Sequence, residues 1–191
     1  MDLDAFSWKW KAVDPEHGNY GNANQWAVGT HLGALVRESA QNSLDARLET
    51  GPATVTYTVV RLDGDDRRKF EQAVKWEQQL APHLAAMATG TEVFSNAIRQ
   101  GLEELNDRSE LVMLRISDTG CRGLTGPELA TDTVDESDYG NFVKLCRLDL
   151  FSGKAQTSGG SYGLGKAVYW RFSAVNTVLL SAWCRQQQPG E

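Results

Sequence analysis

The segment Val28–Glu49 carries the clearest periodic pattern in the sequence. Its apolar residues recur at steps of three and four, which predicts an amphipathic helix of about six turns. We expect its apolar face to consist of Leu32, Leu35, Val36, Ala40, Leu44 and Leu48. Glu38, Asn42 and Asp45 recur at i, i+4 and i+7, so all three are expected on one face. Such a triplet is usually only the solvated side of a surface helix.

Two later segments combine a predicted strand or helix with a polar loop that contains glycines. The run 110–117 is short and mostly apolar, which predicts a buried strand, and a loop from Asp118 to Gly123 follows it directly. The run 152–165 is small, polar and glycine-rich, and a helical pattern follows at 166–172. Along the chain there are thus, in this order, a polar helix face, a strand with an acid at its end, and a glycine-rich loop before a helix.

The remaining segments predict further strands and helices. β-Branched and apolar runs predict strands at 53–62 and 174–183. Helical spacing predicts helices over 67–87 and 91–105, with breaks marked by Pro82 and Gly90, and a short helix at 141–151.

Length and composition predict one well-cored domain, at 191 residues and 41% hydrophobic. We expect an N-terminal arm over 1–27 and a domain over 28–191, as the N-terminal part of a longer protein. The arm holds Trp8, Trp10 and Trp26. Tryptophan suits buried contacts within and between chains, so these residues are expected either to pack on their own core or to cross to a second subunit.

Charge and hydropathy exclude several classes of protein. The net charge of −6 and the isoelectric point near 5.1 argue against a general nucleic-acid-binding or membrane-binding surface. No apolar run reaches the roughly 18 residues of a membrane span, and the first residues lack a signal-peptide core, so we expect a cytoplasmic protein. Scattered cysteines and histidines predict reduced thiols and no zinc site: Cys121, Cys146, Cys184, His17, His31 and His83.

The three features, in this order, resemble the nucleotide-binding domain of the GHKL or Bergerat-fold ATPases, the superfamily of DNA gyrase B, the heat-shock chaperone ATPases, histidine kinases and MutL. The family's first motif, E-x-x-x-N-x-x-D on a helix, is matched by Glu38, Asn42 and Asp45. Its second motif, D-x-G-x-G, is matched by Asp118 and Gly120.

The third motif of the family, a glycine-rich G-x-x-G-x-G, is matched by Gly160, Gly163 and Gly165. Gly123 lies one residue further along than the family's second glycine in the Asp motif, and Thr177 is the nearest candidate for its last motif, a threonine on a strand. The resemblance covers residues from about 28 to 183.

The resemblance implies an α/β (α+β) two-layer sandwich with a mixed, mostly antiparallel sheet covered on one face by helices. Strands near 54–62, 111–117 and 174–183 would contribute to the sheet, with ATP between the helices and the sheet. The implied activity is Mg²⁺-dependent ATP binding and hydrolysis that drives a conformational or dimerisation switch. A domain that binds ATP without useful turnover is the alternative within the family.

The residue types at these positions suit that chemistry. Glu38 can orient and deprotonate a water for attack on the terminal phosphate. Asn42 offers a hard carbonyl oxygen to Mg²⁺. Asp118 can accept a hydrogen bond from the exocyclic amine of adenine. Gly120 and Gly123 are expected to allow close backbone approach to the base.

The glycine-rich loop is expected to bind the phosphates through backbone N–H groups, with the charge of a lysine beside them. The candidate residues are Gly160, Ser161, Tyr162, Gly163, Leu164, Gly165 and Lys166. A P-loop, G-x-x-x-x-G-K over 160–166, is the alternative reading of the same residues. Against it, Ala167 replaces the hydroxyl residue that binds Mg²⁺, no apolar strand precedes Gly160, and the polar helix face is left unexplained.

Residues 124–160 are expected to act as a lid that becomes ordered when ATP binds, because few large apolar residues anchor them before Phe142. In the family such lids couple ATP to dimerisation, so a homodimer formed on ATP binding and a downstream domain or partner protein are expected. DNA repair or topology, chaperone work and defence against foreign DNA are all compatible with the residues.

Overall fold

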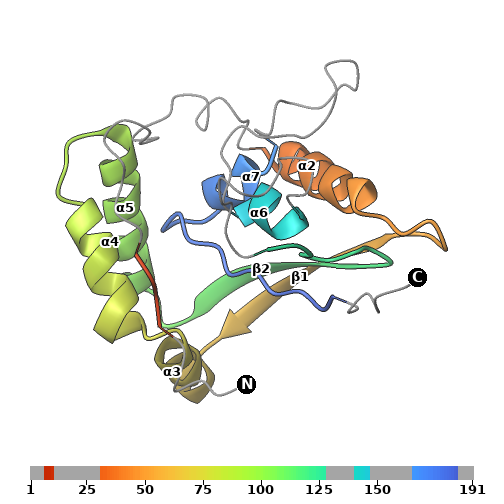
Figure 1. The fold of residues 1–191 in the computed structure, drawn as a ribbon. Coiled ribbons are helices and arrows are strands. Elements are labelled where there is room, and N and C mark those ends of the chain that lie inside the picture. The colour runs from red at the N-terminus through yellow and green to blue at the C-terminus, as the bar shows by residue number, and fades with distance from the viewer. Residues whose placement is uncertain (1–6, 11–30, 128–139, 147–164, 185–191) are drawn as a thin grey trace. The chain divides into compact units, whose positions relative to one another are not determined.

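The computed structural model describes residues 7–10, 31–127, 140–146 and 165–184, and Figure 1 shows them as a coloured ribbon. The chain mixes helices with a two-stranded antiparallel sheet, which agrees with the predicted α/β class. The elements are, in chain order, α2 (Leu32–Asp45), β1 (Thr54–Leu62), α3 (Gly64–Ala73), the π-helix η2 (Trp76–Leu80), α4 (Ala81–Met87), α5 (Val93–Asp107), β2 (Leu111–Thr119), α6 (Asn141–Cys146) and α7 (Ala167–Arg171).

The chain divides into two compact units, and the strands contribute residues to both. The helical unit comprises Met1–Ala23, Thr58–Arg115 and Ser173–Thr177. The site unit comprises Asn24–Tyr57, Ile116–Phe172 and Val178–Glu191. Most of residues 1–27 lies outside the described part, so the division into an arm and one domain stays a prediction.

The helical unit is built on an apolar core. Its buried residues come from η2, α4, α5 and the segment after α7, and they are Leu80, Leu84, Ala88, Ile98 and Val175. Helical spacing over 67–87 is confirmed, but α3 begins at Gly64 and the break falls at Lys75, which has a φ of +50°. Near Pro82 the π-helix η2 passes directly into α4, which begins at Ala81, so the helix changes type at the predicted break without a gap.

The two described tryptophans of the N-terminal arm pack on the helical unit. The indole Nε1–H of Trp8 donates to the carbonyl of Val74 at 2.7 Å, and its backbone N–H donates to Oε1 of Gln79 at 2.9 Å. The Trp10 ring stacks on His83, with ring centroids 3.6 Å apart. For these two residues packing on the same chain is observed; Trp26 lies outside the described residues.

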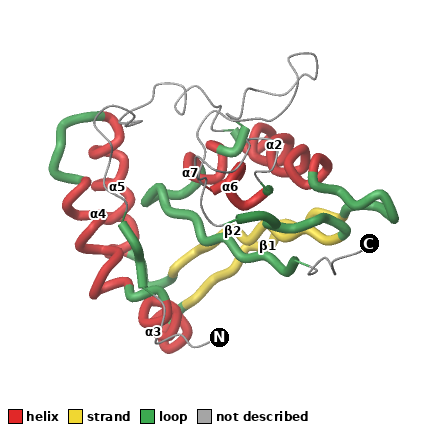
Figure 2. Tube along the Cα trace, in the orientation of Figure 1, coloured by secondary structure: helices red, strands yellow, loops and turns green. Residues whose placement is uncertain are grey.

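Both predicted strands before the glycine-rich loop are confirmed, and Figure 2 shows them side by side. Strand β2 extends to Thr119, so Asp118 lies within the strand and not after it. The strand predicted over 174–183 is wrong, because no strand is present among residues 173–184. Asn176 there has a φ of +50°, and the N–H of Thr177 donates to Oγ of Ser173, so the chain turns where an extended strand was expected.

Helix α2 begins after His31, whose Nδ1 accepts the N–H of Ala34 at 3.1 Å as an N-terminal cap. His31 therefore has a structural role as the N-terminal cap of α2.

The apolar face predicted for α2 is wrong. Of the six apolar residues predicted to form it, Leu35 is buried, but Leu32 is 70% exposed and Val36 and Leu44 are also exposed. The buried positions of the helix are Ala34, Leu35, Ser39 and Ser43. Ser39 Oγ donates to the carbonyl of Leu35 and lies 2.7 Å from the Tyr57 hydroxyl. The inner face thus combines Leu35 with small and hydroxyl-bearing side chains, and the serines there are hydrogen-bonded to residues outside the helix.

Candidate functional site

One hydrogen bond joins the polar helix to the predicted adenine-reading acid. Ser43 Oγ on α2 donates to Oδ2 of Asp118 on β2 at 2.8 Å. Ser43 is buried, whereas Asp118 is exposed. No residue of β2 is buried, so the prediction that the strand over 110–117 is buried is wrong. The bond places the carboxylate of Asp118 beside the helix that carries Glu38 and Asn42.

The glycines that follow Asp118 are required by the fold itself. The carbonyl of Gly120 accepts the N–H of Leu48 at 2.9 Å, which ties the end of β2 to the segment after α2. Gly120 and Gly123 have φ values of +77° and +72°, a region that side chains rarely adopt. A Cβ at Gly120 would lie 2.4 Å from the carbonyl oxygen of Pro52, and one at Gly123 would lie 3.0 Å from that of Trp183. Their contact with a base stays a prediction.

Cys121 lies beside the same carboxylate. Its Sγ donates to the carbonyl of Ser43 at 3.3 Å. Burial raises the pKa of the Cys121 thiol, and the negative charge of Asp118 and a hydrogen bond with it raise the pKa further. The thiol is therefore protonated at neutral pH and is a poor nucleophile.

Asn42 contacts a residue from the helix that follows the glycine-rich loop. Its Nδ2 donates to the hydroxyl of Tyr169 on α7 at 3.2 Å. Burial is the largest cause that raises the pKa of Tyr169, the bond from Asn42 lowers it, and Tyr57, Asp118 and Glu38 each raise it through their charge. The side chains of Asn42, Glu38 and Asp118 thus all influence the pKa of the Tyr169 hydroxyl.

Glu38 lies largely covered on the same helix. Its side chain is 20% exposed, and its Oε1 accepts from Nε of the exposed Arg37 at 3.2 Å. A pair with an exposed arginine contributes about 0–1 kcal/mol, so it is easily exchanged for another partner. The carboxylate can therefore turn to a water or a ligand at little cost.

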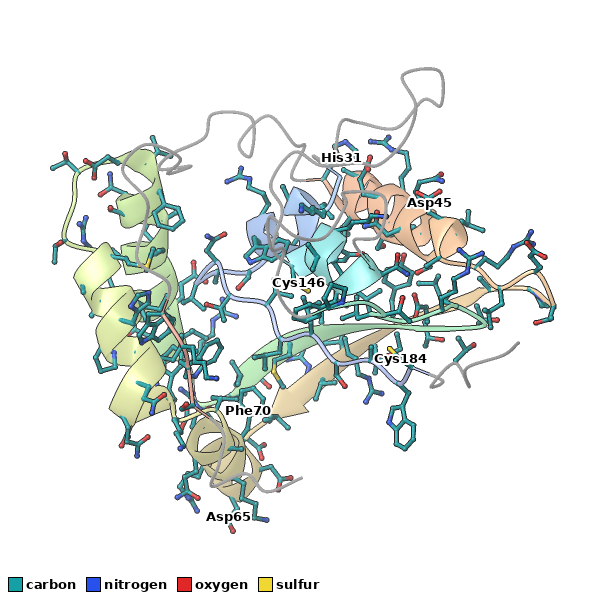
Figure 3. The ribbon with its side chains drawn as sticks, viewed as in Figure 1. His31, Asp45, Asp65, Phe70, Cys146 and Cys184 are labelled. Carbon is teal, nitrogen blue, oxygen red and sulfur yellow. The ribbon has the colours of Figure 1, made fainter. Side chains whose placement is uncertain are left out.

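Asp45, the third residue of the predicted triplet, is placed differently. It is the last residue of α2, is exposed, and its Oδ1 accepts from Nε2 of Gln41 at 2.8 Å. Figure 3 labels His31 and Asp45 at the two ends of the helix. Asn42 thus contacts α7 and Glu38 lies one turn earlier on the same helix, whereas Asp45 lies at the C-terminal end of α2.

Only the end of the glycine-rich loop lies within the described residues. Gly165 is buried, and Lys166 Nζ donates to the carbonyl of Lys144 on α6 at 2.8 Å. A phosphate near Lys166 would compete with this bond. The predicted loop residues Gly160, Ser161, Tyr162, Gly163 and Leu164 lie outside the described part of the chain.

Thr177, the candidate for the family's last motif, is assigned to a different unit from these residues. It belongs to the helical unit, where its hydroxyl donates to the carbonyl of Val175 at 3.0 Å. The strand on which the family carries its threonine is absent from residues 173–184. Its predicted contact with nucleotide stays a prediction.

The oxygen donors at the site suit a magnesium ion held mainly by phosphates. Asn42 and Glu38 offer oxygens one helical turn apart. Within residues 7–10, 31–127, 140–146 and 165–184, no group of three His, Cys, Asp or Glu side chains that could hold a metal ion is present. Mg²⁺ commonly takes one or two protein oxygens and completes its shell with water and phosphate, so this donor set fits it.

Sequence reasoning did not find Ser43 and Tyr169. Ser39 and Ser43 are four residues apart on α2 and both are buried. Paired small hydroxyl residues at helical spacing are a signal that could have identified the inner face. Nothing in the local pattern around Tyr169 indicates its contact with Asn42, which is 127 residues away in the chain.

Comparison of the chain with protein-family models, curated proteins and solved structures gave no match. Among the described helices, none is both long enough and apolar enough to cross a membrane.

Proposed function

We propose that this chain binds Mg·ATP in the site unit and hydrolyses it, as a nucleotide-driven conformational or dimerisation switch of the GHKL type. One observation carries the proposal. The first motif, on α2, and the second, on β2, are joined by the Ser43–Asp118 hydrogen bond, and the Asn42–Tyr169 bond adds the helix after the third motif. These bonds support the proposal, because they join elements that are far apart in the sequence and that carry or follow separately matched motifs.

Adenine recognition is assigned to Asp118. Oδ2 of the carboxylate is held by Ser43, which fixes the plane of the group on an exposed part of β2. A carboxylate accepts hydrogen bonds and donates none, so it pairs with the exocyclic amine of adenine and disfavours a base that presents a carbonyl there. GTP is therefore expected to bind more weakly than ATP.

Magnesium and the attacking water are assigned to α2. Asn42 would supply an oxygen to Mg²⁺, which neutralises charge on the phosphates when it is bound. Glu38, one turn earlier on the helix, would accept a proton from the water that attacks the terminal phosphate. Its exposed pair with Arg37 leaves the carboxylate available for that role.

The two-layer sandwich, the lid and the dimer belong to the same proposal. Within the segment 124–160, α6 is already anchored, because Val143 is fully buried and the N–H of Phe142 donates to the carbonyl of Thr125 at 3.0 Å. The proposed ordering on ATP binding is therefore restricted to parts of the segment other than α6. Hydrogen exchange with and without a non-hydrolysable ATP analogue tests it, and equal protection in both states would contradict it.

Calorimetric titration of the whole chain with ATP and with GTP, each with and without Mg²⁺, tests the proposed function. We expect Mg·ATP to bind and Asp118→Asn to lower its affinity roughly tenfold or more, because a hydrogen bond to a charged group contributes about 1.5–3 kcal/mol. Asp66→Asn on α3 is the matched control, since its side chain is 73% exposed in the helical unit. Absence of ATP binding by the unsubstituted chain would refute the function, and unchanged binding by Asp118→Asn would refute the adenine assignment.

A further inference from the structure

We propose that Tyr169 is a positioning residue that holds the Asn42 side-chain amide so that its oxygen Oδ1 faces the magnesium ion of Mg·ATP. This inference rests on the proposed function, and it adds a residue outside the three motifs. It starts from one contact, in which Asn42 Nδ2 donates to the Tyr169 hydroxyl at 3.2 Å.

The chemistry of an amide makes this contact directional. The carboxamide of Asn42 has a donor nitrogen and an acceptor oxygen at opposite ends of a planar group. When Nδ2 is bound, the direction of Oδ1 is set. Without a partner for Nδ2 the group can turn over, and the NH₂ end, which cannot bind a cation, would face the metal part of the time.

Tyr169 is itself held firmly enough to act as the reference point. It lies on α7, and its neighbour Val168 is fully buried. A tyrosine hydroxyl is un-ionised at physiological pH. Its oxygen therefore accepts the Asn42 bond in the working range of pH.

The position of Tyr169 in the chain gives the contact a further consequence. Helix α7 begins directly after Lys166, the last residue of the predicted phosphate loop. The same short helix therefore connects the loop assigned to the phosphates with the side chain assigned to the metal. Phosphate binding and metal binding are expected to be coupled through this helix.

A hydroxyl deletion with a matched control tests the inference. Tyr169→Phe keeps the ring and removes the acceptor. Tyr57→Phe is the control, because Tyr57 also contacts α2 through its hydroxyl, at Ser39, but does not contact Asn42. Each chain is titrated by calorimetry with ATP in the absence of metal, and then with Mg²⁺ at fixed ATP.

We expect Tyr169→Phe to leave metal-free ATP affinity within about twofold and to raise the Mg²⁺ concentration for half-maximal tightening roughly 3- to 10-fold, the effect of one lost hydrogen bond. Tyr57→Phe should leave the Mg²⁺ midpoint unchanged. In an Asn42→Asp background, Tyr169→Phe should also leave it unchanged, because the two carboxylate oxygens are equivalent and need no orientation.

An unchanged midpoint in Tyr169→Phe would overturn the inference. An equal shift in Tyr57→Phe, or a shift that persists in the Asn42→Asp background, would also overturn it, because either result means a general structural effect. In these cases the proposed function stands. If Mg²⁺ does not tighten ATP binding in the unsubstituted chain, the assignment of the metal to this site fails instead.

Discussion

The buried face of α2 in the site unit differs from the apolar core of the helical unit. In the helical unit, the core is apolar and contains Leu80, Leu84, Ala88, Ile98 and Val175. In the site unit, two of the four buried residues of α2 are Ser39 and Ser43, and both make side-chain hydrogen bonds to strand residues. Several leucine and valine side chains of that helix are exposed instead.

The two kinds of contact have different effects: apolar burial stabilises the fold, whereas hydrogen bonds orient particular side chains. Apolar burial is roughly proportional to area and has no preferred direction, so it stabilises a fold without aligning particular atoms. A hydrogen bond contributes only about 0.5–1.5 kcal/mol net, but it requires defined distances and angles. We therefore expect substitutions in the helical unit to change stability and substitutions in the site unit to change ligand chemistry.

The largest effect is expected at Glu38. Glu38→Ala should bind Mg·ATP nearly as well as the unsubstituted chain and release phosphate about 10²- to 10⁴-fold more slowly, as when a general base is removed. Phosphate release under saturating ATP measures it, with the exposed Glu49→Ala in the same unit as control. Undiminished turnover would place the base elsewhere. Binding without measurable turnover in the unsubstituted chain would favour the non-hydrolysing alternative.

A substitution in the apolar core should produce the opposite pattern. Ile98 is 1% exposed on α5, and Ile98→Ala should lower the free energy of unfolding by about 2–5 kcal/mol through lost burial and a cavity. Val93→Ala on the same helix is the control, because Val93 is 71% exposed. Denaturant titration measures both. If the folded Ile98→Ala protein binds ATP more weakly, the expectation that the helical unit affects stability but not ligand binding is wrong.

The two buried serines of α2 sharpen the comparison within the site unit. Ser43→Ala removes the donor to Asp118, and we expect ATP affinity to fall roughly 3- to 10-fold, the effect of one hydrogen bond. Ser39→Ala removes a contact to Tyr57 that does not involve the acid, so it should lower stability without changing affinity. Calorimetry and denaturant titration on both variants decide this. Equal losses of affinity would mean that both serines affect ATP binding only by holding α2 in position.

The smallest effect is expected from alkaline titration of Tyr169. Its pKa is raised above the ordinary value of 10.0, mainly by burial, so the folded state holds the phenolic proton when the unfolded state has lost it. Stability should therefore fall as the pH rises from 10.0 toward the folded-state pKa. Tyr169→Phe should show a shallower fall there and a parallel curve at neutral pH. Identical slopes at alkaline pH would contradict the burial of the phenol.

Local patterns predicted most of the described elements but misplaced the inner face of α2. Strands β1 and β2 and helices α5, α6 and α7 all lie within or close to their predicted ranges. The apolar face failed because periodicity assumes that a helix turns its larger side chains inward. Here the partners are the Tyr57 hydroxyl and the Asp118 carboxylate, which are 18 and 75 residues away from the serines that meet them.

Local sequence patterns predicted the residue types and their order: a helix bearing Glu38 and Asn42, a strand followed by Asp118, and a glycine-rich loop before a short helix. The contacts of Ser43 with the acid and of Tyr169 with the amide are seen only in the folded chain. These contacts join residues 75 and 127 positions apart in the sequence, which local patterns do not report. Helix and strand patterns express contacts a few residues apart, whereas a hydrogen bond depends on two atoms lying about 3 Å apart, whatever their separation along the chain.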